Sequence, residues 1–304
     1  MKKYSICGVV VTYNRKELLL RNINSLLNQS YPLDIVIYDN ASTDGTYDYL
    51  KENRIIDLPN VTYVKSEHNL GGSGGFYEGE KIAYEKGYDY IWLMDDDGYC
   101  VNKDTLLKLI ENINEKKTIL NSLVICDTEK MLPTFNIGGC KTYEEIKIQS
   151  EGGAILGVGN PYNGTLVPRE CFDEIGFTDQ RFFIYGDEYD FAARSKKAGY
   201  YWKTIIDSVY YHPVNRNVLK EFSLFGHKFD VKDQPIWKWY LETRNSTYNS
   251  ITHNNNRLIF YFYLRAIIVS LNSKDKILKR LYYGFLGVND AFKNNFDRPI
   301  PFKE

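Results

Sequence analysis

The first hundred residues alternate between apolar runs typical of buried strands and segments with helical periodicity. A continuous run rich in β-branched residues predicts a strand buried on both faces at residues 5–12, and residues 34–40, 61–66 and 90–97 predict three further strands. Apolar residues at helical spacing predict helices between them, over residues 15–29, a short segment after Gly45, and residues 75–86. This alternation predicts a parallel sheet with helices on both faces, and such sheets bind ligands at the carboxyl ends of their strands.

The pattern changes twice farther along the chain. Residues 121–159 predict short strands and Gly-rich turns, and the elements predicted after residue 150 are strands at 154–158 and 165–167, a helix at 188–198, and one or two strands within 201–212. After Pro213, aromatic stripes predict three helices, over residues 236–251, 258–271 and 277–292. We therefore expect an α/β domain over residues 1–215 and a helical region over residues 216–304.

Composition narrows the class of protein. The chain has 304 residues, of which 43% are hydrophobic and 25% charged, and a net charge of −1 that gives no field favouring nucleic acid as a partner. Its five cysteines are scattered and form no C-x-x-C pair, which argues against a disulfide framework or a thiolate zinc site and favours a reducing cytoplasm. The longest apolar stretch contains Arg265 and is shorter than the about 20 residues that a spanning helix needs.

Three consecutive aspartates follow the fourth predicted strand. Side chains alternate along a strand, so Asp95 and Asp97 should project to the same side. Two carboxylates at this spacing can share one divalent cation, whose other ligands are phosphate oxygens and water. The position at the ligand-binding edge of the sheet favours this metal site over the alternative, an acidic turn or a helix N-cap.

A Gly-rich segment, Asn69 to Phe76, lies between the third strand and the next helix. Glycines let the backbone approach a ligand, and a helix N-terminus favours anions; a flexible loop is the alternative. The segment is not a P-loop, because no Gly-Lys-Ser/Thr follows, and the dinucleotide fingerprint counted from Gly72 fails at Tyr77.

An acidic segment, FFIYGDEYDF at residues 182–191, combines an aromatic run with three carboxylates at the start of a predicted helix. Such carboxylates usually compensate the helix dipole, but a carboxylate facing a sugar hydroxyl is what a general base requires. We expect the aromatic run to anchor the segment and to shield Glu188 partly from water. His212 ends the last predicted strand of the domain, and imidazole suits ions such as manganese.

These segments, in this order, resemble the inverting glycosyltransferases of family 2. The resemblance covers residues 5–215 and rests on VVTYNR, on DNASTDGT at residues 39–46, on the aspartate triplet, on the acidic segment and on the late histidine. Within the family, NLGGSGGFYEG is most similar to the branch that holds galactofuranosyltransferases and rhamnosyltransferases. The resemblance implies the GT-A fold, a mixed, mainly parallel sheet flanked by helices.

The resemblance also implies a metal-dependent, inverting hexosyltransferase. Its donor would be a nucleotide diphosphate sugar, with UDP-galactofuranose as the best choice and dTDP-rhamnose or another hexose donor as the alternative. Its acceptor would be a hydroxyl of a lipid-linked or growing cell-surface polysaccharide, such as capsule or O-antigen. Inversion follows from a single displacement, in which one base deprotonates the acceptor hydroxyl and no covalent enzyme intermediate forms.

Roles are implied for individual residues. The residues that would line the nucleoside pocket and the donor site are Thr12, Tyr13, Asn14, Arg15, Asp39, Asn69, Gly71, Gly72, Gly74, Gly75, Asp95 and Asp96. Asp95, Asp97 and His212 would hold Mn²⁺ or Mg²⁺. The family places its base at the second of two acidic residues, usually Asp; that position is Glu188 here, so we favour Glu188 over Asp187 as the catalytic base.

The tail leaves alternatives open. From residue 257 onward it carries nine Lys or Arg against four Asp or Glu, interleaved with aromatic residues. It could contact an anionic membrane peripherally near a lipid-linked acceptor, or pack on the catalytic domain or on a second subunit. Two other functional classes remain: a nucleotidyltransferase, which should carry a basic Gly-rich loop near its N-terminus, and a non-catalytic nucleotide-sugar-binding protein, which should have lost a carboxylate from the metal or base site.

Overall fold

The computed structural model describes residues 3–126, 132–213, 219–224, 227–232, 234–254, 259–273 and 276–301. The chain divides into two compact units. The first comprises Met1–Gln180 and Phe191–Val214, and the second comprises Arg181–Asp190 and Asn215–Glu304. Most of the acidic segment therefore packs with the C-terminal elements rather than with the sheet.

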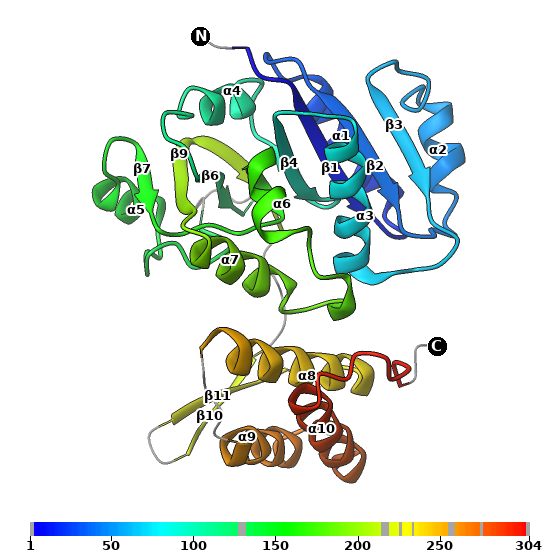
Figure 1. Ribbon diagram of the computed structural model, residues 1–304, viewed down its shortest axis with the longest axis vertical. Helices are drawn as coiled ribbons and strands as arrows, with labels where there is room; N and C mark the ends of the chain where they lie inside the picture. The colour runs from blue at the N-terminus through cyan, green and yellow to red at the C-terminus, as the bar shows by residue number, and fades with distance from the viewer. Residues whose placement is uncertain are drawn as a thin grey trace. The chain divides into compact units, whose positions relative to one another are not determined.

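The first unit is built on a nine-stranded mixed sheet (Figure 1). One half is parallel, with the order β3-β2-β1-β4, and consists of Val61–Lys65, Asp34–Asp39, Ile6–Thr12 and Tyr90–Asp95. Beyond β4 the order continues β8-β6-β9-β5, with β7 paired to β9, and parallel and antiparallel neighbours mix. These strands are Asn163–Pro168, Thr118–Ile125, Tyr201–Tyr211, Tyr99–Cys100 and Ala154–Leu156.

Helices cover both faces of this sheet, because alternate residues of each strand point to opposite cores. Along β1, Val10 joins one apolar cluster with α1, α2 and α4, and Val9 joins the other with α3, α6 and α7. These helices are Lys16–Leu27, Thr46–Glu52, Thr105–Ile110, Gly71–Glu85, Arg169–Ile175 and Asp187–Lys197. A smaller helix, α5 (Tyr143–Gln149), buries Ile146 in a third cluster, and a short 3₁₀ turn spans Gln180–Phe182.

The four strands predicted in the first hundred residues are confirmed, but one helix start and one later region differ. Helix α3 begins at Gly71, four residues before the expected start. Residues 121–159 contain most of β6, a fully buried strand of eight residues, and the helix α5. The sequence pattern hid β6 because Asn121 and Ser122 interrupt its apolar run; both are buried, with hydrogen bonds to the Asn160 carbonyl (2.8 Å) and to the Ser208 hydroxyl (2.9 Å).

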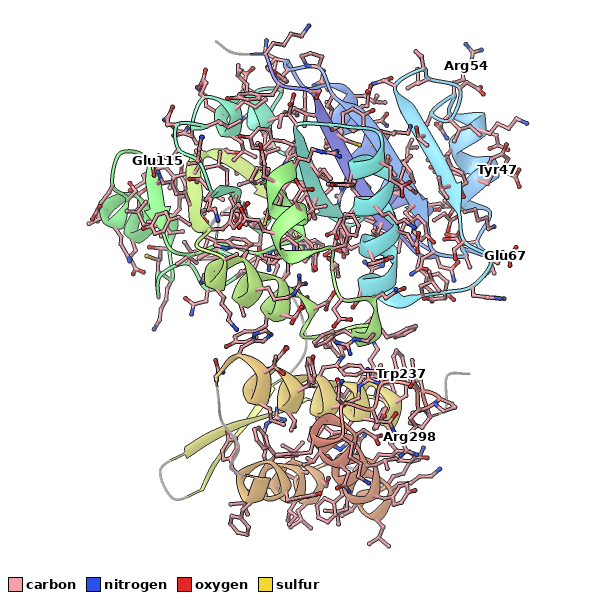
Figure 2. The ribbon with its side chains drawn as sticks, viewed as in Figure 1. Tyr47, Arg54, Glu67, Glu115, Trp237 and Arg298 are labelled. Carbon is pink, nitrogen blue, oxygen red and sulfur yellow. The ribbon has the colours of Figure 1, made fainter. Side chains whose placement is uncertain are left out.

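The second unit contains the three predicted helices, α8 (Ile236–His253), α9 (Ile259–Leu271) and α10 (Ile277–Phe292). It also contains an antiparallel hairpin that was not predicted, β10 (Leu219–Leu224) with β11 (His227–Lys232). Helices α8 and α10 pack closely, since a Cβ at Gly287 would lie 2.9 Å from the Tyr240 carbonyl oxygen. Arg298, which Figure 2 labels, donates two hydrogen bonds to the buried Asp290 (2.6 and 3.0 Å). Among the helices that the structure describes, none combines the length and the apolar character needed to cross a membrane.

Candidate active site

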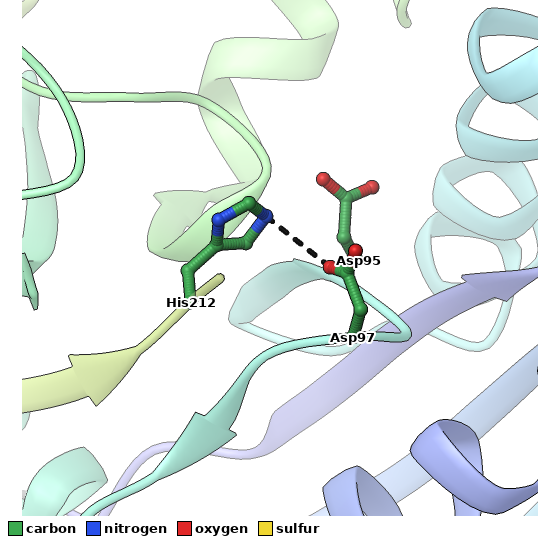
Figure 3. A group of neighbouring side chains, drawn as sticks. All are labelled: Asp95, Asp97 and His212. Carbon is green, nitrogen blue, oxygen red and sulfur yellow. Dashed lines mark ion pairs between the residues drawn. The ribbon is translucent and has the colours of Figure 1, made fainter. Parts of the chain in front are cut away.

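The three predicted metal ligands lie together in the first unit (Figure 3). Asp95 is the last residue of β4, Asp97 follows it by two positions, and His212 comes directly after β9. One ligand atom from each residue lies within 4.8 Å of the others. The arrangement brings two carboxylates and one imidazole to the edge of the sheet where such folds bind ligands.

The donor set fits a divalent cation. Nε2 of His212 is 3.2 Å from Oδ1 of Asp97. That carboxylate oxygen is nevertheless buried without a properly oriented hydrogen bond from any described residue. A buried carboxylate oxygen needs polar partners, and besides the imidazole of His212 a cation shared with Asp95 would provide one. Carboxylate and imidazole ligands together suit manganese.

The electrostatics of this cluster follow from the same contact. Burial favours the protonated form of Asp97, but the neighbouring His212 outweighs it and holds the pKa of Asp97 below its ordinary 3.8. Burial favours neutral His212 as well, but Asp97 outweighs it and raises the pKa of His212 above 6.5. Without a cation, the pair therefore tends to carry opposite charges.

Asp96 points away from this cluster and braces the loop after β1. It is buried and accepts hydrogen bonds from the Thr12 hydroxyl (2.7 Å) and the Tyr13 amide (3.4 Å). Nη1 of Arg15 lies 3.1 Å from Asp96 and 2.7 Å from Asp97. Burial raises the pKa of Asp96 to about 6, although Arg15 works in the opposite direction. Arg15 thus ties the predicted nucleoside loop to the aspartate triplet.

The loop after β1 is also tied to the loop after β2. The Asn14 amide donates to Ser42 Oγ (2.9 Å), and the Thr43 amide donates to Asn14 Oδ1 (2.7 Å). Asp39 is fully buried; its Oδ1 accepts from the Ser42 amide (2.7 Å), and its Oδ2 accepts from the Tyr63 hydroxyl. Each carboxylate oxygen can accept a further bond, so the predicted contact of Asp39 with a nucleobase stays a prediction. The ring of Tyr13 is exposed.

The Gly-rich segment is held by Asn40, a residue that the sequence analysis did not single out although it lies within DNASTDGT. Its Nδ2 donates to the Gly71 carbonyl (2.7 Å), and its Oδ1 accepts from the Leu70 amide (2.8 Å). Oδ1 of Asn69 accepts from the Gly71 amide (2.8 Å). The two asparagines fix the first turn of α3 beside the carboxyl end of β2.

The predicted donor glycines serve different purposes. A Cβ at Gly74 would lie 2.5 Å from Leu70 Cβ, and one at Gly75 would lie 2.4 Å from Val11 Cγ1. Real Cβ atoms do not approach so closely, so these two glycines let α3 pack against its own first turn and against β1. A Cβ at Gly72 would meet nothing within 4 Å. Gly72 therefore has the space beside it that a bound donor would need.

Residues 182–190 of the acidic segment belong to the second unit. Asp187 is buried, with 5% of its surface exposed, whereas Glu188 is exposed. The expectation that the aromatic run shields Glu188 is therefore wrong: Phe182 is fully buried, but the chain then turns so that Glu188 faces solvent. Oε2 of Glu188 accepts from the Gly186 amide (3.2 Å).

Comparison with known proteins places these features in a family. The sequence profile of the protein family described as Glycosyl transferase family 2 matches residues 7–155. A galactofuranosyltransferase, GlfT1 of Mycobacterium tuberculosis, is 30% identical over 251 residues, which cover 80% of this chain and 81% of that protein. The chain belongs to glycosyltransferase family 2. The expected enzyme class, a glycosyltransferase using a nucleotide sugar, is thereby confirmed, and the nucleotidyltransferase alternative is removed.

Two more distant similarities are informative. The dTDP-rhamnosyl transferase RfbF of Shigella flexneri is 24% identical over 184 residues, which cover 59% of each chain. The solved structure of a mannosyltransferase from Pyrobaculum calidifontis, in complex with GDP-Man and Mn²⁺, aligns with a TM-score of 0.54 at 16% identity and covers 96% of this chain and 75% of that one. This second likeness concerns the fold and confirms the expected GT-A architecture.

Proposed function

We propose that this family 2 enzyme transfers galactofuranose from UDP-galactofuranose to a hydroxyl of a lipid-linked or growing cell-surface polysaccharide. The observation that carries the proposal is the match to a protein named galactofuranosyltransferase, which extends over 80% of the chain and so includes much more than residues 7–155, the part that the family model matches. Rhamnose from dTDP-rhamnose is the second candidate, supported by the shorter match to a rhamnosyl transferase.

A divalent cation, Mn²⁺ or Mg²⁺, is part of this proposal. Asp95, Asp97 and His212 would hold it, and the buried Oδ1 of Asp97 that lacks a hydrogen bond supports that assignment. When bound, the cation supplies positive charge that neutralises the diphosphate leaving group. Arg15 balances the remaining carboxylate charge through its contacts with Asp96 and Asp97.

The chain's own polar groups would bind and orient the donor. We assign the nucleoside to the loop from Thr12 to Arg15 and to Asp39, which lie at the carboxyl ends of β1 and β2. Asp39 is held rigidly by the Ser42 amide and the Tyr63 hydroxyl, which suits a group that must recognise one base. Gly72 leaves open space for the donor beside the first turn of α3.

Glu188 is our choice for the catalytic base. A base must reach the acceptor hydroxyl, and the exposed carboxylate of Glu188 is accessible to an acceptor, whereas Asp187 is buried. The Gly186 amide donates a hydrogen bond to the Glu188 carboxylate, which orients the carboxylate and leaves it able to accept a proton. Removal of the acceptor proton by Glu188 lets the hydroxyl oxygen displace the nucleotide diphosphate in one step, with inversion at the anomeric carbon.

A donor screen tests the proposed substrate. The full chain is incubated with Mn²⁺, a lipid-linked saccharide acceptor and, in turn, UDP-galactofuranose, UDP-galactopyranose and dTDP-rhamnose, and both nucleotide diphosphate release and glycan mass are recorded. We expect turnover with UDP-galactofuranose and a product heavier by one hexose. Turnover with dTDP-rhamnose alone would replace the proposed donor, and the absence of any transfer while the nucleotides still bind would favour a non-catalytic sugar-binding protein.

The second unit offers a surface for peripheral membrane contact. Large apolar side chains recur at helical spacing and are partly or largely exposed: Phe260, Leu264, Ile267 and Leu271 on α9, and Leu278, Tyr282 and Phe285 on α10. Helix α9 has no acidic residue, and the one acidic residue of α10, Asp290, is buried against Arg298. An apolar face with exposed lysines fits an anionic lipid surface. Arg257, Lys274 and Lys303 of the basic tail lie outside the described residues.

Vesicle sedimentation tests this contact. We expect the protein to sediment with vesicles containing anionic phosphatidylglycerol more than with neutral ones, and the double variant Leu278→Glu, Tyr282→Glu to remain in the supernatant. Ile148→Glu is the matched control, because Ile148 is as exposed as Leu278 (85% and 83%) but lies in the first unit. If the double variant instead turns a dimer into a monomer and leaves sedimentation unchanged, the surface binds a second subunit.

A further inference from the structure

Helix α8 carries a polar stripe, Asn245, Asn249 and His253, whose members are spaced four residues apart and therefore lie on one face. Asn245 is fully buried and Asn249 almost so. Asparagine is a poor helix former and is rarely buried without a polar partner. Nδ2 of each asparagine and Nε2 of the histidine face partners in the acidic segment, and these partners follow in the same order along the chain. Oδ1 of Asn245 accepts from Nε of Arg244 on the same helix (2.9 Å).

The stripe binds backbone carbonyl groups at the start of the acidic segment. Nδ2 of Asn245 donates to the carbonyl oxygens of Phe182, Ile184 and Tyr185, at 3.0, 2.8 and 2.8 Å. Nδ2 of Asn249 donates to the Gly186 carbonyl oxygen (2.7 Å). The buried Arg244, next to the stripe, donates to the carbonyl oxygens of Arg181 (3.2 Å) and Phe182 (3.3 Å). Side chains of α8 thus bind consecutive carbonyl groups of the segment, and that of Gly186 also accepts the Asp190 amide (3.0 Å) at the start of α7.

These bonds hold a conformation that the segment would not keep alone. Phe183 and Tyr185 both have φ of 66°, a region that side-chain-bearing residues rarely adopt, and Gly186 has φ of 87°. A Cβ at Gly186 would lie 2.9 Å from Asn249 Nδ2 and 3.4 Å from Asn245 Cβ. Only glycine therefore allows the stripe to approach so closely.

The stripe also holds the far end of the segment. Nε2 of His253 is 2.8 Å from Oδ1 of Asp190, and both side chains are largely buried. Glu188 lies between the two anchored ends, and its carboxylate is bound by the Gly186 amide, whose own carbonyl is held by Asn249. The direction of the Glu188 side chain consequently depends on the backbone that α8 fixes.

We propose that Asn245, assisted by Asn249, is a positioning residue for sugar transfer: it fixes the backbone of residues 182–186 and with it the carboxylate that accepts the proton. The proposal rests on the proposed function in one respect, namely that the base belongs to the acidic segment. A displacement of about 1 Å in a reacting group can cost about 10²-fold in rate. The C-terminal helical region is then required for turnover, although donor and metal residues are assigned to the first unit.

The test uses the full chain with three substitutions on α8. Asn245→Asp keeps the shape but replaces both N–H donors by a carboxylate facing three carbonyl oxygens. Asn249→Ala removes one bond and serves if Asn245→Asp does not fold. Thr243→Val is the matched control, because Thr243 is a buried residue of the same helix whose hydroxyl has no hydrogen bond from any described group. Turnover is expressed per donor-binding site counted by calorimetry, which removes the contribution of unfolded protein.

We expect Asn245→Asp to lower kcat by about 10²-fold and Asn249→Ala to lower it by less. The donor KM and the affinities for UDP and manganese should stay within about threefold of the parent values, because α8 lies outside the donor loops. Amide hydrogen exchange of residues 182–190 should accelerate in both variants, and Thr243→Val should change neither quantity. Unchanged exchange in Asn245→Asp would overturn the anchoring itself. Faster exchange with normal transfer would overturn the positioning role.

The base assignment is measured separately with Glu188→Gln and Asp187→Asn. If both transfer sugar normally while Asn245→Asp loses turnover, the proposed base is wrong but the segment still positions a reacting group. If Glu188→Gln loses transfer while Asn245→Asp does not, the base stands and the positioning proposal fails.

Discussion

The imidazole of His212 meets the carboxylate of Asp97 although the two residues follow strands that are not neighbours. Nε2 and Oδ1 lie 3.2 Å apart, while β8 and β6 separate β4 from β9 in the sheet. The contact depends on no local sequence motif, and it defines the centre of the proposed metal site.

Removal of one metal ligand should abolish most activity. Asp97→Asn keeps the size of the side chain but weakens its hold on a cation, and stabilisation of a leaving group by a metal is worth several kcal/mol, so we expect turnover to fall by about 10²-fold or more. The measurement is transfer at saturating donor and Mn²⁺, with circular dichroism to verify the fold. Asp57→Asn, at an exposed aspartate away from the site, is the control. Full wild-type activity in EDTA would contradict the metal assignment.

The His212–Asp97 pair should give the metal-free protein a pH-dependent stability. Because the pKa of His212 is raised, its contribution to folding stability is complete below the unfolded value near 6.5 and is lost as pH rises through the folded pKa. Because the pKa of Asp97 is lowered, its contribution to folding stability is present above the unfolded value and is lost as pH falls through the folded pKa. We expect His212→Gln to reduce the free energy of unfolding in urea at about pH 6 and to change it much less at about pH 9. An equal loss at both pH values would argue against the pair.

Two glycines of α3 should respond differently to alanine. A Cβ at Gly75 would clash with Val11, so Gly75→Ala should lower the free energy of unfolding by about 1–3 kcal/mol. A Cβ at Gly72 has open space, so Gly72→Ala should leave stability within about 1 kcal/mol of the parent but weaken donor binding, because the methyl group occupies the space assigned to the donor. Urea denaturation and calorimetry with the nucleotide sugar separate the two effects. Unchanged stability of Gly75→Ala would mean that α3 lies farther from β1.

Variants of the two candidate bases should also differ in thermal stability. Glu188→Gln removes the proton acceptor at an exposed position, so we expect a loss of transfer of about 10²–10⁴-fold with donor affinity within a few-fold and an unchanged Tm. Asp187→Asn alters a buried carboxylate, so we expect it to lower Tm while retaining more transfer. If Glu188→Gln transfers normally and Asp187→Asn does not, the base is Asp187; normal transfer by both would leave the segment with a structural role.

Sequence reasoning worked where burial imposes a simple pattern. Parallel strands covered on both faces need continuous apolar runs, and β1, β2 and β4 are such buried strands, whereas the edge strand β3 is only partly buried. Asp95 and Asp97 were predicted to face the same side because they end and follow such a strand, and the family resemblance added His212 to them. The first turn of α3 was missed because glycines have low helix propensity, although here packing against Val11 requires them.

The remaining features depend on partners that are distant in sequence. The sequence around Asn245 predicts only a helix, and nothing in the neighbouring residues indicates that three carbonyl groups of another segment lie opposite its side chain. The exposure of Glu188 was likewise hidden, because it follows from left-handed φ angles at Phe183 and Tyr185, two aromatic residues that rarely adopt them.

The strand order has a consequence for the route by which the protein acquires its metal. The two aspartates are close in sequence, but the imidazole comes beside Asp97 only when β5 pairs with β9, which sets Tyr99 opposite Tyr211. Such non-local pairings form slowly, so high-affinity manganese binding should appear late in refolding, after β9 has paired. Metal supplied during synthesis would then not speed folding, and protein made without the metal can bind it once the protein is native.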